Sequence, residues 1–220
     1  LFIVYKNLCF GLINQPCITQ EKLRQDIFFV DNYFFMPYSR FLFLTIQEVL
    51  WPMNIFYLSS NPVIAANYHC DKHVVKMILE SAQMLSTAWR CQKEAEQDFF
   101  SQKLDELGVY KIAHKNHPSC IWARESGPNY KWLYSLFCSL CVEYRVRYEK
   151  VHASEKLLGF LANIPKKIDG VGGFTPPPQC MPDQYKQDDT VGAYRAFYIG
   201  EKSGFARWNY SKKPEWMENN

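Results

Sequence analysis

Two histidines, two lysines and two acidic residues fall within fourteen residues of the sequence, in the stretch NYHCDKHVVKMILE (67–80). If this stretch is helical, four of these side chains line one face, at offsets of 0, 4, 7 and 11 residues: His69, His73, Lys76 and Glu80. Side chains of these types bind metal ions, transfer protons or contact phosphate groups. The cluster therefore predicts a functional helix and leaves its chemistry open.

Asp71 lies on another face of the same predicted helix, in line with the apolar residues Val74, Val75 and Ile78. We expect its carboxylate near the core at the start of the helix, where it must accept hydrogen bonds or pair with a cation. Buried carboxylates of this kind occur at catalytic sites and also as structural caps. Asp71 is therefore a candidate catalytic residue, with a structural role as the alternative.

Four histidines form a candidate ligand set for a metal ion: His69, His73, His114 and His117. Two histidines at i and i+4 of a helix can bind one ion, and the stretch HKNHP (114–118) would supply the other two. Three cations lie among these histidines and would repel a metal ion: Lys72, Lys76 and Lys115. We therefore favour an anionic substrate and expect neither a metal nor another cofactor, with a metal-dependent hydrolase of nucleotides or phosphoesters as the alternative.

The stretch GAYRAFYIGEKSGFARW (192–208) interleaves aromatic and basic residues. Aromatic rings can stack on nucleic-acid bases while neighbouring cations contact phosphates. Arg195 and Lys202 are therefore candidate nucleic-acid contacts, although both could equally be solvated surface charges. We expect Tyr194 and Phe197 to belong to the core.

The spacing of apolar residues and turn residues predicts a mainly α, single compact domain with a long Pro-rich loop. Asn61 and Pro62 are typical of a helix start, and this helix is expected to run to about Arg90. The other expected elements are a loop with a helical turn over 92–106, a short helix from about Pro118, a turn at 126–129 followed by a long helix, an extended loop over 163–187, and a last helix capped by Asp188 or Asp189.

The first 52 residues differ from the rest of the chain. They begin with Leu1 and hold eight of the sixteen phenylalanines without a clear periodicity, whereas a well-patterned sequence starts at Met53. We expect residues 1–52 to be an N-terminal extension that derives from translated upstream sequence, and residues 53–220 to be the functional domain. An ordered β-rich extension is the alternative.

Composition limits the environment and the partners of the chain. No signal peptide or run of about 18 apolar residues is found, so we expect a cytoplasmic protein with no membrane span. Cys138 and Cys141 form a C-x-x-C without a second pair, so we expect reduced core cysteines rather than a zinc site. The net charge of +3 is compatible with a polyanionic partner, and we expect a monomer.

Four stretches together carry a resemblance to known proteins: HCDKHVVKM, HKNHPSCIWARES, PPPQCMPDQYK and YRAFYIGEK. They look like an uncharacterised family of phage and environmental genomes. The order of features from Met53 to about residue 210 also resembles the pyrimidine-dimer DNA glycosylases, small all-α enzymes with an N-terminal nucleophile. In that family a short N-terminal segment precedes a helix that bears basic residues beside a catalytic carboxylate. By this resemblance the carboxylate position falls on His73 here, with Asp71 and Glu80 as the nearest acids.

The resemblance implies a DNA-acting enzyme, a base-excision glycosylase/AP lyase that attacks damaged or modified bases with an amine. The α-amine of Met53 or the amine of Lys76 would be the nucleophile, although Met53 can react only if the chain starts there. Proton transfer falls to Asp71, His73 or His117. The expected phosphate contacts are Lys72, Lys115, Arg124, Arg195 and Lys202. A non-enzymatic nucleic-acid-binding protein remains the third hypothesis.

Overall fold

The computed structural model describes residues 53–92 and 97–218, and all regular elements in these ranges are helical. The mainly α prediction is therefore confirmed for the described residues, whereas the predictions for residues 1–52 lie outside them. The α-helices are α4 (Pro62–Tyr68), α5 (Asp71–Arg90), α6 (Gln97–Glu106), α7 (Pro118–Ala123), α8 (Gly127–Tyr148), α9 (Leu158–Leu161), α10 (Thr190–Lys202) and α11 (Glu215–Glu218). Two short 3-10 helices complete the order: η2 (Ala153–Leu157) and η3 (Asp183–Tyr185).

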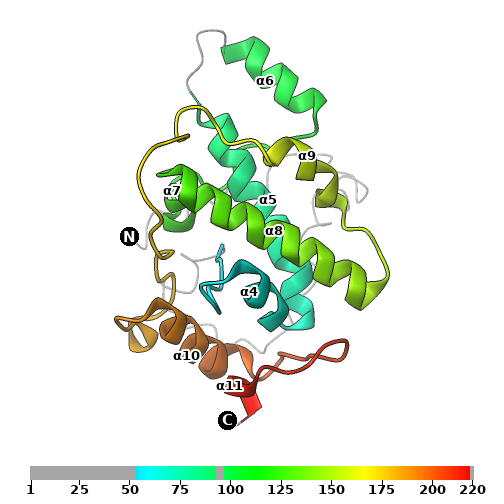
Figure 1. The fold of residues 1–220 in the computed structure, drawn as a ribbon, viewed down its shortest axis with the longest axis vertical. Helices are drawn as coiled ribbons and strands as arrows, with labels where there is room; N and C mark the ends of the chain where they lie inside the picture. The colour runs from blue at the N-terminus through cyan, green and yellow to red at the C-terminus, as the bar shows by residue number, and fades with distance from the viewer. Residues whose placement is uncertain (1–52, 93–96, 219–220) are drawn as a thin grey trace, which may run out of the picture. The chain divides into compact units, whose positions relative to one another are not determined.

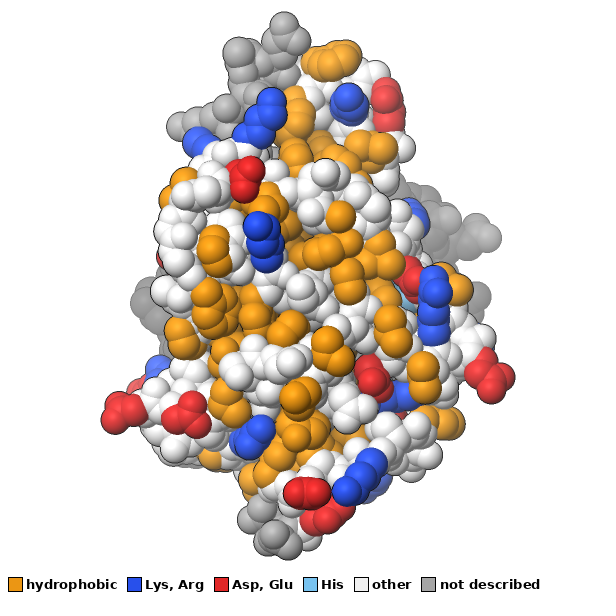
Figure 2. All heavy atoms as spheres, viewed as in Figure 1, with side chains coloured by type: hydrophobic (Ala, Val, Ile, Leu, Met, Phe, Trp, Pro, Cys, Tyr) orange, Lys and Arg blue, Asp and Glu red, His pale blue; other side chains and the backbone are white. Residues whose placement is uncertain are grey.

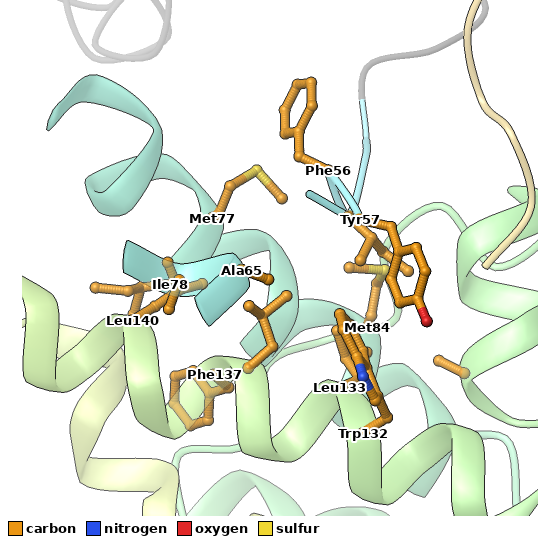
Figure 3. Packing of buried hydrophobic residues seen from close by; sticks show 14 of the residues in the cluster. Phe56, Tyr57, Ala65, Met77, Ile78, Met84, Trp132, Leu133, Phe137 and Leu140 are labelled. Atoms are coloured by element: carbon orange, nitrogen blue, oxygen red, sulfur yellow. The ribbon is translucent and has the colours of Figure 1, made fainter. Parts of the chain in front are cut away.

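The core lies where α8 packs against α5 and α4 (Figure 1). α8 contributes a buried stripe of large apolar side chains that face the buried side of α5 (Figure 3). Buried members of this core from the three helices include Ala65, Met77, Ile78, Leu133, Phe137 and Leu140. α7, α9 and η2 also pack against α5, so most of its surface is buried and only part of it faces solvent.

Local caps define several helix boundaries. The side chain of Asn61 accepts hydrogen bonds from backbone N–H groups at the start of α4, Ser126 does so for α8, and Asp189 for α10. These residues satisfy N–H groups that have no partner within the helix. The predicted turn at 126–129 is therefore the start of α8, and Asp189 is the cap of α10.

The predicted continuous helix from residue 62 to residue 90 is wrong, because the chain breaks at His69 and Cys70 into α4 and α5. The break is held by distant residues. The guanidinium of Arg147 donates to the carbonyls of Asn67 and His69 at 2.9 and 2.8 Å, and the N–H of Cys70 donates to the hydroxyl of Tyr198 at 2.9 Å. These bonds replace those that a continuous helix would make.

Two further predictions need correction. The stretch over 92–106, expected as a loop with one turn, contains helix α6 of ten residues. Val75, expected in the buried stripe, is 36% exposed, whereas Val74 and Ile78 are fully buried. The predicted long loop over 163–187 contains no α-helix, as expected, although the 3-10 helix η3 lies within it.

Candidate active site

A buried carboxylate on α5 contacts the segment that leads into the domain. Glu80 is 6% exposed, and its Oε2 accepts a hydrogen bond from the backbone N–H of Asn54 at 3.0 Å. Its Oε1 lies 3.2 Å from Nζ of Lys76, whose side chain is 57% exposed. Burial raises the pKa of Glu80 above its ordinary value, and Lys76 and the Asn54 N–H oppose that rise. The carboxylate of Glu80 thus lies beside one backbone nitrogen, that of Asn54, and one side-chain nitrogen, that of Lys76.

The segment over 53–58 is held rigidly in an extended, irregular conformation. The side-chain oxygen of Asn54 accepts from the N–H groups of Ile55 and Phe56, at 2.7 and 3.0 Å, while its amide donates to the carbonyl of Cys180 at 2.9 Å. Phe56 has a φ of 49°, in the left-handed region that non-glycine residues seldom adopt. Backbone strain of this kind persists only where the surrounding structure imposes it.

Met53 precedes this contact and is 1% exposed, with its Sδ accepting from the thiol of Cys120 at 3.4 Å. Three covalent bonds join its nitrogen to that of Asn54, so the two nitrogens lie no more than about 4.3 Å apart. The nitrogen of Met53 is therefore close to the carboxylate of Glu80. In a chain that starts at Met53, this nitrogen would be a primary amine.

The connector before α7 carries two histidines, of which His114 lies near Glu80. Ala113 is tied to α5, since its N–H donates to Oγ1 of Thr87 at 3.2 Å and its carbonyl accepts from that hydroxyl at 3.3 Å. His114 follows with a φ of 47°, is exposed, and lies close enough to Glu80 to lower the pKa of that carboxyl. His117 is buried and caps α7, with its Nδ1 accepting from the N–H of Ser119 at 3.2 Å.

Part of the chain that includes these residues matches a known family. Residues 53–156 match the family model for pyrimidine dimer DNA glycosylase. Over these residues the chain carries a domain of that family. Neither the curated proteins nor the solved structures contain a match to this chain. The match ends within η2, and Cys180, which lies beyond it, accepts a hydrogen bond from the side-chain amide of Asn54.

Asp71 is buried, as predicted, but its partners are structural. Its Oδ1 accepts from Nη1 of Arg147 at 3.2 Å, and its Oδ2 accepts from the N–H of Asn209 at 2.7 Å. Nine residues separate it from Glu80, which places the two carboxylates on opposite faces of α5 and about 13.5 Å apart along its axis. Asp71 therefore lies away from the Glu80 cluster.

His73 does not face solvent, contrary to the prediction that it points toward the substrate. Its ring stacks on Phe56, with centroids 4.4 Å apart, and its Nδ1 lies 2.7 Å from the hydroxyl of Tyr198. Burial lowers the pKa of His73 well below its ordinary value. The hydroxyl of Tyr198 already accepts from Cys70, so its own proton is available for Nδ1 of His73. His73 is therefore a neutral member of an aromatic cluster.

The four histidines do not assemble into a metal site. His69 lies outside α5, where its Nδ1 donates to the carbonyl of Ala65 at 2.6 Å, and burial lowers its pKa to about 4. Within residues 53–92 and 97–218, no group of three or more His, Cys, Asp or Glu side chains could hold a metal ion. The alternative that places His69, His73, His114 and His117 around one cation is thus wrong for this fold.

The predicted phosphate contacts fall into two groups. Lys72 and Lys115 are exposed, and Nζ of Lys72 lies 5.8 Å from the ring centroid of Phe205, which is itself 37% exposed. Arg195, in contrast, donates to the carbonyl of Leu58 at 3.0 Å and packs over the rings of Tyr68 and Trp216. Nζ of Lys202 lies 4.6 Å from the ring centroid of Phe197, and Arg124 is half-buried with no partner for its Nη1.

Charge on the face drawn in Figure 2 is mixed, with acidic and basic side chains interspersed among hydrophobic ones. This face offers no extended positive surface for DNA. On α5, Lys72, Lys76 and Glu80 follow one another at intervals of four residues and so share a helix face, which we call the α5 stripe. No helix in the described part of the chain is long and apolar enough to cross a membrane.

The sequence interpretation missed Glu80 as the central carboxylate, although it placed Glu80 on the same face as Lys76. One signal was available, because Asp71 and Glu80 are the only acidic residues of α5. The contact with Asn54 was not accessible from sequence spacing, since 26 residues and a helix break separate the two positions.

Proposed function

We propose that the domain is a DNA glycosylase/AP lyase that removes damaged or modified bases through an amine nucleophile beside Glu80. The observation that carries the proposal is the 3.0 Å hydrogen bond from the Asn54 N–H to Oε2 of Glu80, which puts the start of the domain against a buried carboxylate. The family match over residues 53–156 supports a DNA substrate.

Two amines fit the role of nucleophile. The first is the α-amine of Met53, which exists only in a chain that starts at that residue. The second is Nζ of Lys76, which lies 3.2 Å from Oε1 of Glu80 and is present in any form of the protein. Loss of a proton from either ammonium group would free the lone pair that attacks C1′ of the nucleotide.

Glu80 is the group we assign to proton transfer, in place of Asp71 or His73. The neutral amine forms a bond to C1′ as the bond between C1′ and the base breaks, and the base leaves with that electron pair and takes a proton from water. Glu80 accepts the proton that the bonded amine loses and gives it to O4′ as the C1′–O4′ bond opens, which leaves the Schiff base at C1′. Asp71 is occupied by Arg147, and His73 is stacked on Phe56. Neither is positioned beside the two candidate amines.

The α5 stripe is the surface we assign to the DNA strand. Lys72 and Lys76 lie about 6 Å apart along the helix axis, which suits contacts with neighbouring phosphates. The exposed ring of Phe205 beside Lys72 offers a stacking surface for a base. We retain Lys115 as a further phosphate contact because it is exposed next to His114.

Borohydride trapping tests the proposal, because it reduces a Schiff base between an amine and C1′ to a stable adduct. The full chain and a chain that starts at Met53 are incubated with undamaged, UV-irradiated and abasic duplexes. We expect an adduct on the UV or abasic strand that is lost in Glu80→Gln. The matched control is Glu201→Gln, which changes an exposed glutamate of α10 and should retain the adduct. If neither protein forms an adduct with any duplex, the proposed function is wrong for these substrates.

A further inference from the structure

His114 takes no part in the proposed attack of the amine on C1′. It is exposed, whereas the neighbouring Glu80 and His117 are buried. It lies in the left-handed region with a φ of 47°, although it is not a glycine. Such a conformation is unfavourable for a residue with a side chain and is found where the surrounding structure imposes it.

The structure imposes this conformation from both sides of the residue. On the N-terminal side, Ala113 makes two hydrogen bonds with the hydroxyl of Thr87, a residue of α5 two turns beyond Glu80. On the C-terminal side, the N–H of His117 donates to the carbonyl of His114 at 2.8 Å, and His117 caps α7. The thiol of Cys120 lies 3.6 Å from the carbonyl of Ala113 and 3.4 Å from Sδ of Met53, so the backbone of His114 is held between α5 and the Met53 end of the site.

We propose that His114 is a second proton-transfer group of the site, the base that removes the C2′ proton in the strand-cleavage step. The inference rests on the proposed function, because it requires a Schiff base at C1′. Glu80 is buried against the attacking amine, whereas the exposed imidazole of His114 can approach the sugar from the solvent side. A neutral imidazole accepts a proton near neutral pH.

The step balances as a β-elimination. His114 takes the proton from C2′, and the electrons of the C2′–H bond form C2′=C3′ through the enamine as the C3′–O bond breaks. The oxygen leaves with its electron pair as the phosphate of the downstream strand. The iminium at C1′ remains and is hydrolysed by water, which releases the enzyme amine and an unsaturated aldehyde.

The test compares strand scission with Schiff-base trapping on one abasic duplex, using the full chain. His114→Asn is the main variant, because asparagine adopts the left-handed region readily and its amide cannot accept the proton. His152→Gln is the matched control, a histidine that caps η2 outside the site. We expect His114→Asn to trap as the unmodified protein does and to cleave the strand at least 10-fold more slowly.

The outcomes separate the role of His114 from the proposed glycosylase/AP lyase function. Equal scission rates for His114→Asn and the unmodified protein would overturn the role of His114 and leave the glycosylase proposal standing. Loss of both trapping and scission in a folded His114→Asn protein would also overturn it, because His114 would then act before the elimination. Failure of the unmodified protein to trap any strand would overturn the proposed function, and this inference with it.

Discussion

Replacement of Arg147 by methionine should destabilise the domain strongly, because its guanidinium joins three helices. The side chain is completely buried. It donates to the carbonyls of Asn67 and His69 at the end of α4, to Asp71 at the start of α5, and to Glu143 within α8 at 2.9 Å. Methionine fills a similar volume and donates no hydrogen bond.

The expected loss follows from the groups left behind. Removal of one partner from a buried ion pair costs about 3–5 kcal/mol, since the other charge stays buried without compensation. Two carbonyls also lose a charged donor, at roughly 1–3 kcal/mol each if water cannot reach them. These terms overlap, and we expect the unfolding free energy to fall by about 4 kcal/mol, or Tm by roughly 8–16 °C for a domain of this size.

Chemical denaturation at pH 7 measures this loss, and a double-mutant cycle with Asp71→Asn isolates the pair. The double variant should be less destabilised than the sum of the single variants, because the uncompensated charge of Asp71 is removed with its partner. A loss below about 1 kcal/mol for Arg147→Met would refute the reasoning, since it would mean that these buried groups find water or other partners. Folded Asp71→Asn should still form the trapped adduct.

Three further predictions concern single side chains. At pH 7 Glu80→Gln should raise the unfolding free energy while abolishing trapping, because burial raises the pKa of Glu80 and the ionised carboxylate destabilises the fold. The gain should be larger at pH 8 than at pH 5 in chemical denaturation, and no gain at pH 8 would contradict this. The pKa of His69 is lowered to about 4, so the unfolded chain binds a proton at this residue at higher pH than the folded chain does. The unfolding free energy should therefore fall by about 2 kcal/mol from this residue as the pH is lowered from 7 to 5. A His69→Gln variant that loses as much stability over this range as the unmodified protein would contradict this. Phe205→Ala should weaken DNA binding without changing its salt dependence, whereas Lys72→Gln should reduce the salt slope by about one; equal slopes would exclude a phosphate contact for Lys72.

Local signals in the sequence predicted several elements well. Asn61, Ser126 and Asp189 are cap residues next to apolar periodic stretches, and α4, α8 and α10 begin directly after them. The break between α4 and α5 has no such signal. It depends on Arg147 and Tyr198, which lie far along the chain and supply the hydrogen bonds that a continuous helix would have made for itself.

The candidate site was predictable only in part, for the same reason. The pattern around Asp71 predicted its burial and its need for a partner, both of which are confirmed. The pattern could not separate a structural carboxylate from a catalytic one, because the difference lies in long-range contacts. Arg147 pairs with Asp71, whereas the N–H of Asn54 donates to Glu80. The aromatic cluster that buries His73 likewise combines segments from both ends of the domain.

The central claim is that the reacting amine lies beside Glu80, and peptide mapping of the reduced adduct tests it most directly. The adduct formed on abasic DNA is digested, and the modified residue is located by mass spectrometry. We predict modification at the nitrogen of Met53 in a chain that starts there, or at Lys76, whose Nζ lies 3.2 Å from Glu80. Modification confined to any lysine other than Lys76 would contradict the account.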